Sequence, residues 1–478
     1  MSVLSALVAT VLASCTKNIL DTVPQTSISS VTAFSTPAKI LAQVNALYGD
    51  LQNGSFYGGR YVLFNEQRGE EFSQNDPNAA TGALIWNQNA LATTDLVNNL
   101  WSAAYTAINS SNILIQNLTS TTVISDTLAQ QYIGEAKFVR ALAYFSLVQT
   151  WAKPFAEDSS SLGLPLRLQA ETSQGDNNLA RSSVGTVYTQ IIQDLNDAET
   201  ALPASYASAS LNSSRAHKSS AIALKTRVYL AEKNYASVET EAAKLVPSSA
   251  PYQYTSGTVT HKLEANITTV FSGTYTGSEA IFFIPFGTAA ETPATQSSLA
   301  YNYVGEPVLS LNPSGIASNP VFASTSTDAR LGLIATSGGQ QLLKKFPHST
   351  APFNDAIPVI RYAEVLLNYA EAAANNNDLT TATALLYAVR NRSDPNYVFD
   401  PSAIETQTAL INTILTERRI ELLGEGFRTP DLQRTLQNLP SKSGAAGTAP
   451  LVLTTASNYI WPIPTSETSV NKLCQPNP

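Results

Sequence analysis

Apolar residues recur at every third or fourth position through much of the chain, a spacing that places them on one face of an α-helix. The pattern predicts helices over residues 37–51, 95–118, 126–151, 184–202, 218–232 and 235–245. Pro37 suits the first turn of the first helix, and Pro154 cannot continue the third. The chain is therefore predicted to be mainly α-helical.

Two segments have the character of helical hairpins. Residues 221–245 and 357–392 each consist of a helix rich in Ala, Leu and Tyr, a short turn containing Asn, and a second Ala-rich helix. Small residues at helical spacing let antiparallel helices approach closely, as in tetratricopeptide units. The strict tetratricopeptide signature is absent, so plain helical hairpins are the alternative interpretation.

Two other segments keep no helical period. Residues 54–89 are rich in Gly, Asn and aromatic side chains, and within residues 247–357 only the segment 280–284 is typical of a buried strand. Residues 461–464 alternate apolar residues with prolines and are expected to be extended. Long irregular segments in compact domains usually carry function, so we expect ligand-binding residues on the first two.

Composition narrows the function. The chain has 478 residues, of which 44% are hydrophobic and 13% charged, and its net charge is −8. The hydrophobic and charged shares are typical of a globular protein, and the negative net charge argues against a nucleic-acid partner.

The first residues predict a lipid anchor. The apolar run 4–13 is too short to span a membrane and leads into Leu12-Ala13-Ser14-Cys15, a lipobox. We expect residues 1–15 to be a lipoprotein signal segment with Cys15 as the lipid attachment site, and residues 16–36 to be an extended tether. The alternative is an ordinary apolar segment with a chance cysteine, and no Lys or Arg precedes the run as a signal peptide requires.

The few charged residues gather in the segments 361–372 and 416–428. Glu417, Glu421 and Glu425 lie one helical turn apart, so one interpretation is a catalytic carboxylate pair of the glycosidase kind. Neighbouring arginines hold carboxylates ionised, however, whereas a general acid needs a raised pKa. We therefore predict that this group forms structural ion pairs, whose members are Arg361, Glu364, Glu417, Arg418 and Glu421. The chain is not expected to be an enzyme.

No motif for a metal or cofactor is present. The three histidines are far apart in sequence, and no phosphate-binding loop, nucleophile elbow or zinc-protease motif occurs. We expect no metal and no cofactor.

The ligand-binding candidates are aromatic and amide side chains on the irregular segments, because sugar rings stack on aromatic planes and amides bond to hydroxyl groups. The alternative is that these rings form local cores under the loops. The candidates are Tyr57, Trp86, Asn87, Asn89, Tyr301 and Tyr303.

Several motifs, in order along the chain, resemble those of the SusD/RagB family of outer-membrane nutrient-binding lipoproteins. They are GEAKFVRA at 134–141, RYAEVLLNYAEA at 361–372, VRNR at 389–392, ERRIELLGEGFR at 417–428 and WPIP at 461–464. The resemblance implies a superhelix of tetratricopeptide-like helix pairs with a large irregular ligand-binding half. It divides the chain into an N-terminal helical part (37–246, with a binding loop at 54–89), an irregular insertion (247–357) and a C-terminal helical part (358–478).

The same resemblance implies a non-catalytic role at the extracellular face of the outer membrane. Such a protein captures oligosaccharide or polysaccharide and delivers it to a SusC-like TonB-dependent transporter. The alternatives are a peptide-binding member of the family and, third, a glycan-degrading enzyme. Ligand residues vary between members, so the resemblance transfers none to this chain.

Overall fold

A computed structural model describes residues 30–172, 178–272, 274–288 and 291–477. Cys15 and most of the expected tether lie outside the described residues. The last part of that tether is not extended throughout, because Ser30–Ala33 form the single-turn helix α1.

Helices account for most of the regular structure. The long ones pack on one another around a single large core. They are α2 (Pro37–Leu51), α5 (Asp95–Leu118), α6 (Asp126–Trp151), α8 (Val184–Ala201), α10 (Lys218–Ala231), α11 (Tyr235–Ala242), α13 (Tyr362–Asn375), α14 (Leu379–Ser393) and α15 (Gln407–Glu421). Shorter ones are α3 (Arg60–Gln67), α4 (Ala83–Trp86), α7 (Phe155–Asp158), α9 (Ala209–Ser214), α12 (Ile267–Val270), α16 (Arg428–Arg434) and α17 (Thr465–Val470).

The predicted helices are confirmed, and three of them have the predicted bounds. Their starts are fixed locally: the side chains of Thr36 and Ser125 accept hydrogen bonds from the backbone of the first turns of α2 and α6. The pairs α10–α11 and α13–α14 are joined by turns of three residues, which makes them the hairpins expected from the sequence. The fold is thus mainly α-helical, with tetratricopeptide-like helix pairs.

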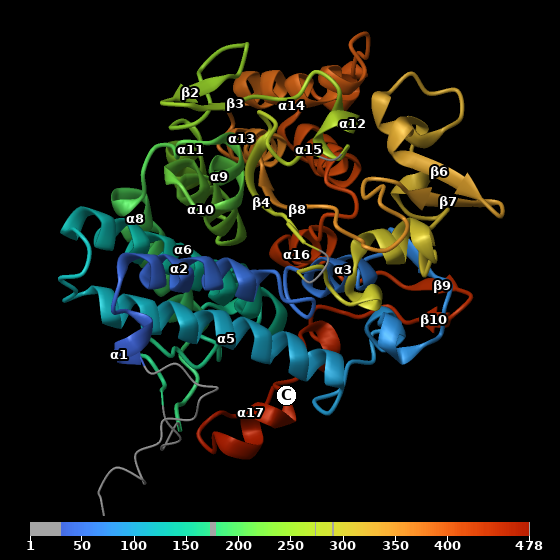
Figure 1. The fold of residues 1–478 in the computed structure, drawn as a ribbon. Helices are drawn as coiled ribbons and strands as arrows, with labels where there is room; N and C mark the ends of the chain where they lie inside the picture. The colour runs from blue at the N-terminus through green and yellow to red at the C-terminus, as the bar shows by residue number, and fades with distance from the viewer. Residues whose placement is uncertain (1–29, 173–177, 273, 289–290, 478) are drawn as a thin grey trace, which may run out of the picture.

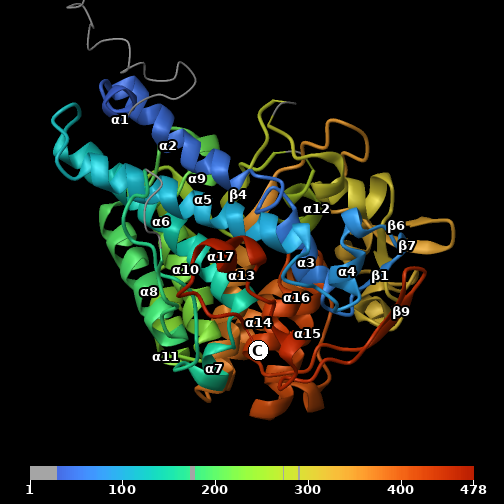
Figure 2. The same cartoon turned by 90° about the horizontal axis from the view of Figure 1, so that it is seen from below.

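The helices and the irregular segments occupy different sides of the molecule. Figures 1 and 2 show α8, α10 and α11 on one side, and the strands β6, β7 and β9 on the other. Within the described chain the strands form five two-stranded antiparallel sheets. These are β1 (Phe72–Gln74) with β5 (Leu309–Leu311), β2 (Tyr254–Ser256) with β3 (Val259–His261), β4 (Ala280–Ile284) with β8 (Ile357–Arg361), β6 (Ile334–Ser337) with β7 (Gln340–Leu343), and β9 (Lys442–Gly444) with β10 (Gly447–Ala449).

The structure corrects the prediction for residues 54–89. This segment contains α3, α4 and β1 instead of being loop throughout. All eight residues of α3 are buried, so no polar face marks the helical period in the sequence. The insertion likewise holds several strands of three to five residues besides the predicted one at 280–284, and these are too short to show a pattern.

The junction between insertion and C-terminal part is also corrected. The helix predicted from residue 357 begins at Tyr362, because Ile357–Arg361 form β8 and pair with β4. All five residues of β8 are buried, and a short buried run does not distinguish strand from helix. The β4–β8 sheet therefore joins the insertion to the last helices.

A buried ion-pair network also connects the insertion to the C-terminal part. Within the described residues it has as many cations as anions, and every side chain is at most 5% exposed. The cations are Arg330, Lys345, Arg361, Arg390 and Arg392, and the anions are Glu279, Asp328, Glu417, Glu421 and Glu425. Four members come from the insertion and six from the C-terminal part. Removing the charges of one part would leave charges of the other part buried without partners.

In the described part of the chain, no helix combines the length and the apolar character needed to cross a lipid bilayer. The longest helix, α6, carries charged residues along its length.

Candidate functional site

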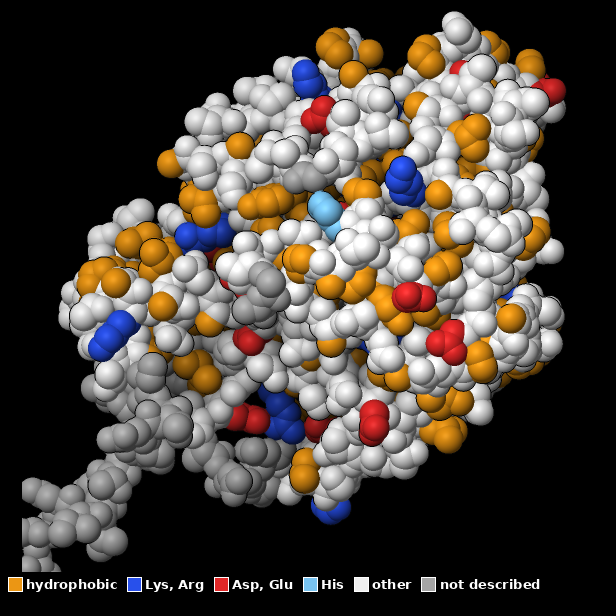
Figure 3. Space-filling model, turned by 45° about the vertical axis from the view of Figure 1, so that its right-hand side comes forward, with side chains coloured by type: hydrophobic (Ala, Val, Ile, Leu, Met, Phe, Trp, Pro, Cys, Tyr) orange, Lys and Arg blue, Asp and Glu red, His pale blue; other side chains and the backbone are white. Residues whose placement is uncertain are grey.

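A cavity of about 260 Å³ opens where the insertion meets β8. We call it the insertion cavity. Its wall is formed by α12 and the residues after it, the end of β4, and the segment 345–358. Its volume is slightly below the range of roughly 300–1,000 Å³ for ligand pockets, which fits a small part of a longer ligand. In Figure 3, hydrophobic side chains gather beside a surface histidine and a hollow across this face of the molecule.

Four aromatic side chains line the cavity: Phe271, Tyr275, Phe283 and Phe286. Tyr275 is half-buried, and its hydroxyl shares a hydrogen bond of 2.8 Å with Ser210. That bond fixes the position of the ring while part of it remains accessible. The two phenylalanines at 271 and 286 are 8% and 7% exposed, so only their edges reach the cavity.

Three polar residues of the wall, His348, Asn354 and Asp355, come from one loop, residues 348–356. His348 is exposed, and its Nδ1 lies 2.5 Å from Asp355 Oδ1. The backbone N–H of His348 donates to the second carboxylate oxygen of Asp355 at 3.0 Å. Burial raises the pKa of Asp355, and the contacts with His348 oppose this shift. The exposed amide of Asn354 lies beside the pair.

Lys345 closes the inner end of the cavity. Its ammonium donates to Glu425 Oε1 at 2.6 Å and to the carbonyl of Glu421 at 2.7 Å, and it lies 5.0 Å from the centre of the Phe271 ring. Burial lowers the pKa of Lys345, against the opposing effect of Glu425. The ion-pair network thus supports one wall of the insertion cavity.

A second, shallower groove of about 370 Å³ lies between α5 and α17. Its indole, Trp101, is only 2% exposed and donates to Glu467, and Tyr105 is half-buried. Arg167 lies between Glu171 and Glu467 and pairs with both. The charged groups of this groove are therefore engaged with one another.

Comparison with known proteins identifies the family. Residues 19–230 match the family model described as "Starch-binding associating with outer membrane", and residues 339–478 match the SusD family model. The crystal structure of a SusD superfamily protein from Bacteroides fragilis is 31% identical, with a TM-score of 0.83, over 93% of this chain and 100% of that one. The chain belongs to the SusD/RagB family.

Other SusD relatives agree with this assignment. A SusD-like protein of Formosa agariphila is 25% identical over 95% of this chain and 93% of its own length. A laminarin-binding SusD-like protein, 23% identical, has the same fold with a TM-score of 0.70 over 93% of this chain and 99% of that one.

Three of the aromatic candidates are core residues of this SusD fold. Trp86 is fully buried, and its indole N–H donates to the carbonyl of Phe72 at 2.9 Å. Tyr303 is also fully buried, with its hydroxyl 3.3 Å from the carbonyl of Gly424. Because neither ring has an accessible face, the prediction that they stack on a ligand is wrong for this structure.

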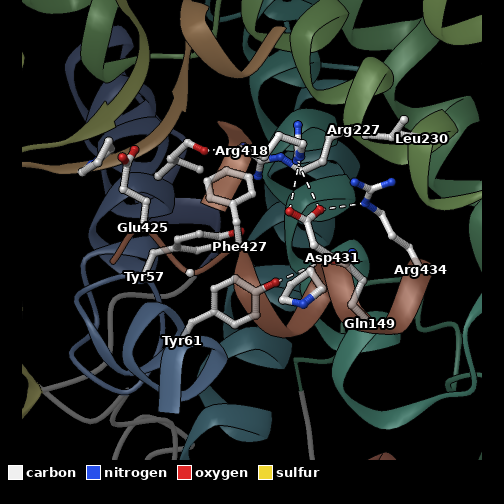
Figure 4. A pocket seen from close by; sticks show the side chains of 14 residues that line it. Tyr57, Tyr61, Gln149, Arg227, Leu230, Arg418, Glu425, Phe427, Asp431 and Arg434 are labelled. Atoms are coloured by element: carbon white, nitrogen blue, oxygen red, sulfur yellow. Dashed lines mark hydrogen bonds and ion pairs between the residues drawn. The ribbon is translucent and has the colours of Figure 1, made fainter. Parts of the chain in front are cut away.

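Tyr57 is the third such residue. It is 3% exposed, its hydroxyl lies 3.0 Å from Ser146 Oγ, and it lines a small cavity of about 30 Å³ at the seam between the two helical parts. Figure 4 shows this cavity, with Arg418 and Arg434 both directed at Asp431 on the far side. The volume suits one or two water molecules, not a sugar.

The remaining candidates stay predictions. Tyr301 is half-buried and packs edge-on against Phe353, with ring centres 5.7 Å apart, so it lies behind the loop that carries His348. Asn87 is half-buried and Asn89 exposed, and neither lines the insertion cavity.

The charged candidates all form ion pairs, although with unexpected partners. Arg361 pairs with Glu279, Glu421 and Glu425, while Glu417 pairs with Arg330 and Arg390. In addition, Glu364 pairs with Arg227, and Arg418 with Asp431. Burial favours the neutral form of Glu421, but three surrounding arginines outweigh burial and hold its pKa well below the ordinary value.

The sequence analysis missed the polar side of the insertion cavity. His348 and Asp355 are seven residues apart in a segment without period, and nothing in the sequence shows that the chain turns back between them. Tyr275 and Phe271 were detectable only as aromatics on an irregular segment. The buried contact between His217 and His261, whose Nε2 atoms lie 3.4 Å apart, has no sequence signal either.

Proposed function

We propose that this SusD-family chain is a non-catalytic protein that captures oligosaccharide or polysaccharide at the insertion cavity. The observation that carries the proposal is the composition of the cavity wall: a positioned aromatic ring, Tyr275, faces a loop of exposed hydrogen-bonding groups, His348 and Asn354. Sugar rings need both, because they present apolar faces and hydroxyl edges. The name of the laminarin-binding relative and the description of the N-terminal family model support the same ligand class.

The three carboxylates that resembled a catalytic group in the sequence support the non-catalytic part of the proposal. Glu417, Glu421 and Glu425 are each ion-paired with a buried cation, and all three are at most 5% exposed. A glycosidase needs one carboxylate that stays protonated and a second that faces the substrate. Buried carboxylates that are paired with cations do not face a substrate, so these three do not form a glycosidase pair.

The cellular setting is the outer membrane. We propose that Cys15 carries a lipid which anchors the protein at the extracellular face, and that the captured glycan passes to a TonB-dependent transporter. The lipobox and the family model described as associating with the outer membrane support this part. Recovery of such a transporter with the protein from outer membranes of its own producer cells tests it, and recovery from the soluble fraction alone contradicts it.

Electrophoresis through native gels that contain a polysaccharide tests capture. We expect at least one polysaccharide to retard the wild-type protein, with no oligosaccharide released on prolonged incubation. Tyr275→Ala should weaken retardation about tenfold, equivalent to about 1.4 kcal/mol, while Tyr275→Phe keeps the ring and most of the binding.

A matched control is Tyr229→Ala, which removes a half-buried tyrosine of α10 that does not line the cavity. It should migrate like the wild type. Binding of peptides but of no polysaccharide contradicts the proposal in favour of the peptide-binding alternative, and release of oligosaccharides contradicts the non-catalytic role.

A further inference from the structure

We infer that the glycan taken by the insertion cavity is uncharged, and that His348, held by Asp355, is the hydrogen-bonding residue that contacts it. This inference rests on the proposed function. It deepens that function by naming the class of glycan and the residue that recognises it.

The cavity offers no cation to an acidic sugar. Among the described residues that line it, Lys345 is the sole ammonium or guanidinium group. Its side chain is 2% exposed and is engaged with Glu425 and with the carbonyl of Glu421. Arginine or lysine that meets a sulfate or carboxylate does so with its own donors and charge. Two of the three N–H donors of Lys345 are used, and its charge is paired with Glu425.

The cavity offers no uncompensated carboxylate either. Both oxygens of Asp355 are bound by His348, one through Nδ1 at 2.5 Å and one through the backbone N–H at 3.0 Å. The side chain of Asp355 is 8% exposed, against 48% for His348. Asp355 is thus a positioning residue, and what the ligand meets is the imidazole ring.

The pairing decides what that ring presents. With Nδ1 held by Asp355, Nε2 is the ring nitrogen of His348 that is left to form a hydrogen bond with a ligand. The exposed amide of Asn354 adds donors beside it, and Thr274 adds an exposed hydroxyl on the opposite wall. Uncharged acceptors and donors next to an aromatic ring match neutral sugar hydroxyls.

The net charge of −8 also disfavours binding of an anionic glycan. A polyanion approaching this protein is repelled at long range, and at low ionic strength the repulsion is strongest. No free cation in the cavity is available to reverse it.

Native gels at low ionic strength test the inference with two sets of polysaccharides. The neutral set is laminarin, starch and galactomannan, and the anionic set is alginate, polygalacturonate and carrageenan. We expect retardation by at least one neutral polymer and by no anionic one. Retardation by any anionic polymer overturns the inference but leaves glycan capture standing, whereas no retardation by any polymer of either set overturns the proposed function itself.

Two variants test the role of His348 against the retained neutral polymer. His348→Phe keeps a ring but removes the hydrogen-bonding ring nitrogens, and we expect about tenfold weaker retardation with an unchanged unfolding temperature, since the side chain is half exposed. Lys344→Ala, which removes an exposed charge next to the cavity segment, is the control and should not change retardation. Wild-type retardation of His348→Phe overturns the assignment of His348.

Discussion

Glu421→Gln is the substitution that tests the ion-pair network most sharply. Glu421 is completely buried and pairs with three arginines of two chain segments: Arg361 at 2.6 Å, Arg330 at 3.1 Å, and Arg392. Glutamine has nearly the same shape, so packing is kept. The change removes one negative charge from a balanced network and turns an amide N–H₂ toward arginine donors.

The expected loss can be worked out from this geometry. Removing one partner of a buried pair costs about 3–5 kcal/mol, because the other partner remains buried and uncompensated. Unfolding entropy of about 2.1 cal/mol/K per residue gives about 1 kcal/mol/K for 478 residues. The unfolding temperature should therefore fall by about 3–5 °C.

Thermal unfolding followed by circular dichroism measures this loss at pH 7. The control is Glu405→Gln, the same change at an exposed residue just before α15, which should stay within about 0.5 kcal/mol of the wild type. An unfolding temperature of Glu421→Gln equal to that of this control would show that the network does not hold the insertion to the last helices. Loss of glycan retention at unchanged stability would place Glu421 in the binding site instead.

Two further predictions concern the core. Trp86→Ala empties a fully buried indole site and breaks the hydrogen bond to the Phe72 carbonyl. We expect a loss of about 3–5 kcal/mol in unfolding free energy, with glycan retention unchanged below the unfolding temperature. Weaker retention at full stability would instead place Trp86 in the ligand site. Burial lowers the pKa of His217 to about 4, and burial and the neighbouring His217 lower the pKa of His261 to about 3. The contribution of each histidine to stability is therefore present above pH 6.5 and is lost as the pH falls toward 4, by roughly 3 kcal/mol each. Urea unfolding between pH 7 and pH 4 should show a smaller loss for His261→Phe than for the wild type, and an equal loss refutes the assignment.

The sequence was sufficient to predict the helices that are buried on one face and exposed on the other. α2 and α5 each have an apolar face and a polar face, so the helical period shows in the sequence, and the Thr36 cap also marks the start of α2. α3 and β8 are buried on all sides by segments distant in sequence, so their residues carry no period that sequence reasoning can use.

Three of the binding candidates, Tyr57, Trp86 and Tyr303, failed for a related reason. Trp86 and Tyr275 are both aromatic residues on irregular segments, and composition does not distinguish them. Their difference is tertiary. Trp86 is fully buried, with the ammonium of Lys442 at the start of β9 5.0 Å from its indole, while Tyr275 remains half-buried beside an open cavity.

The sequence indicated that these charged residues form ion pairs, but it did not indicate which residues pair with which. Spacing of four residues indicated a ladder along α15, but Glu417 and Glu421 turn to Arg330, 87 and 91 residues away. A sequence gives the charges of a buried network, and only the packing of the helices shows which charges meet.

The central claim is that the insertion cavity is where the glycan binds, and hydroxyl-radical footprinting of the protein with and without the retained polysaccharide tests it most directly. The account predicts that oxidation of Tyr275 and His348 falls on binding, while oxidation of Tyr105 in the groove between α5 and α17 does not change. Protection of Tyr105 with unchanged oxidation of Tyr275 and His348 would contradict it and move the site to that groove.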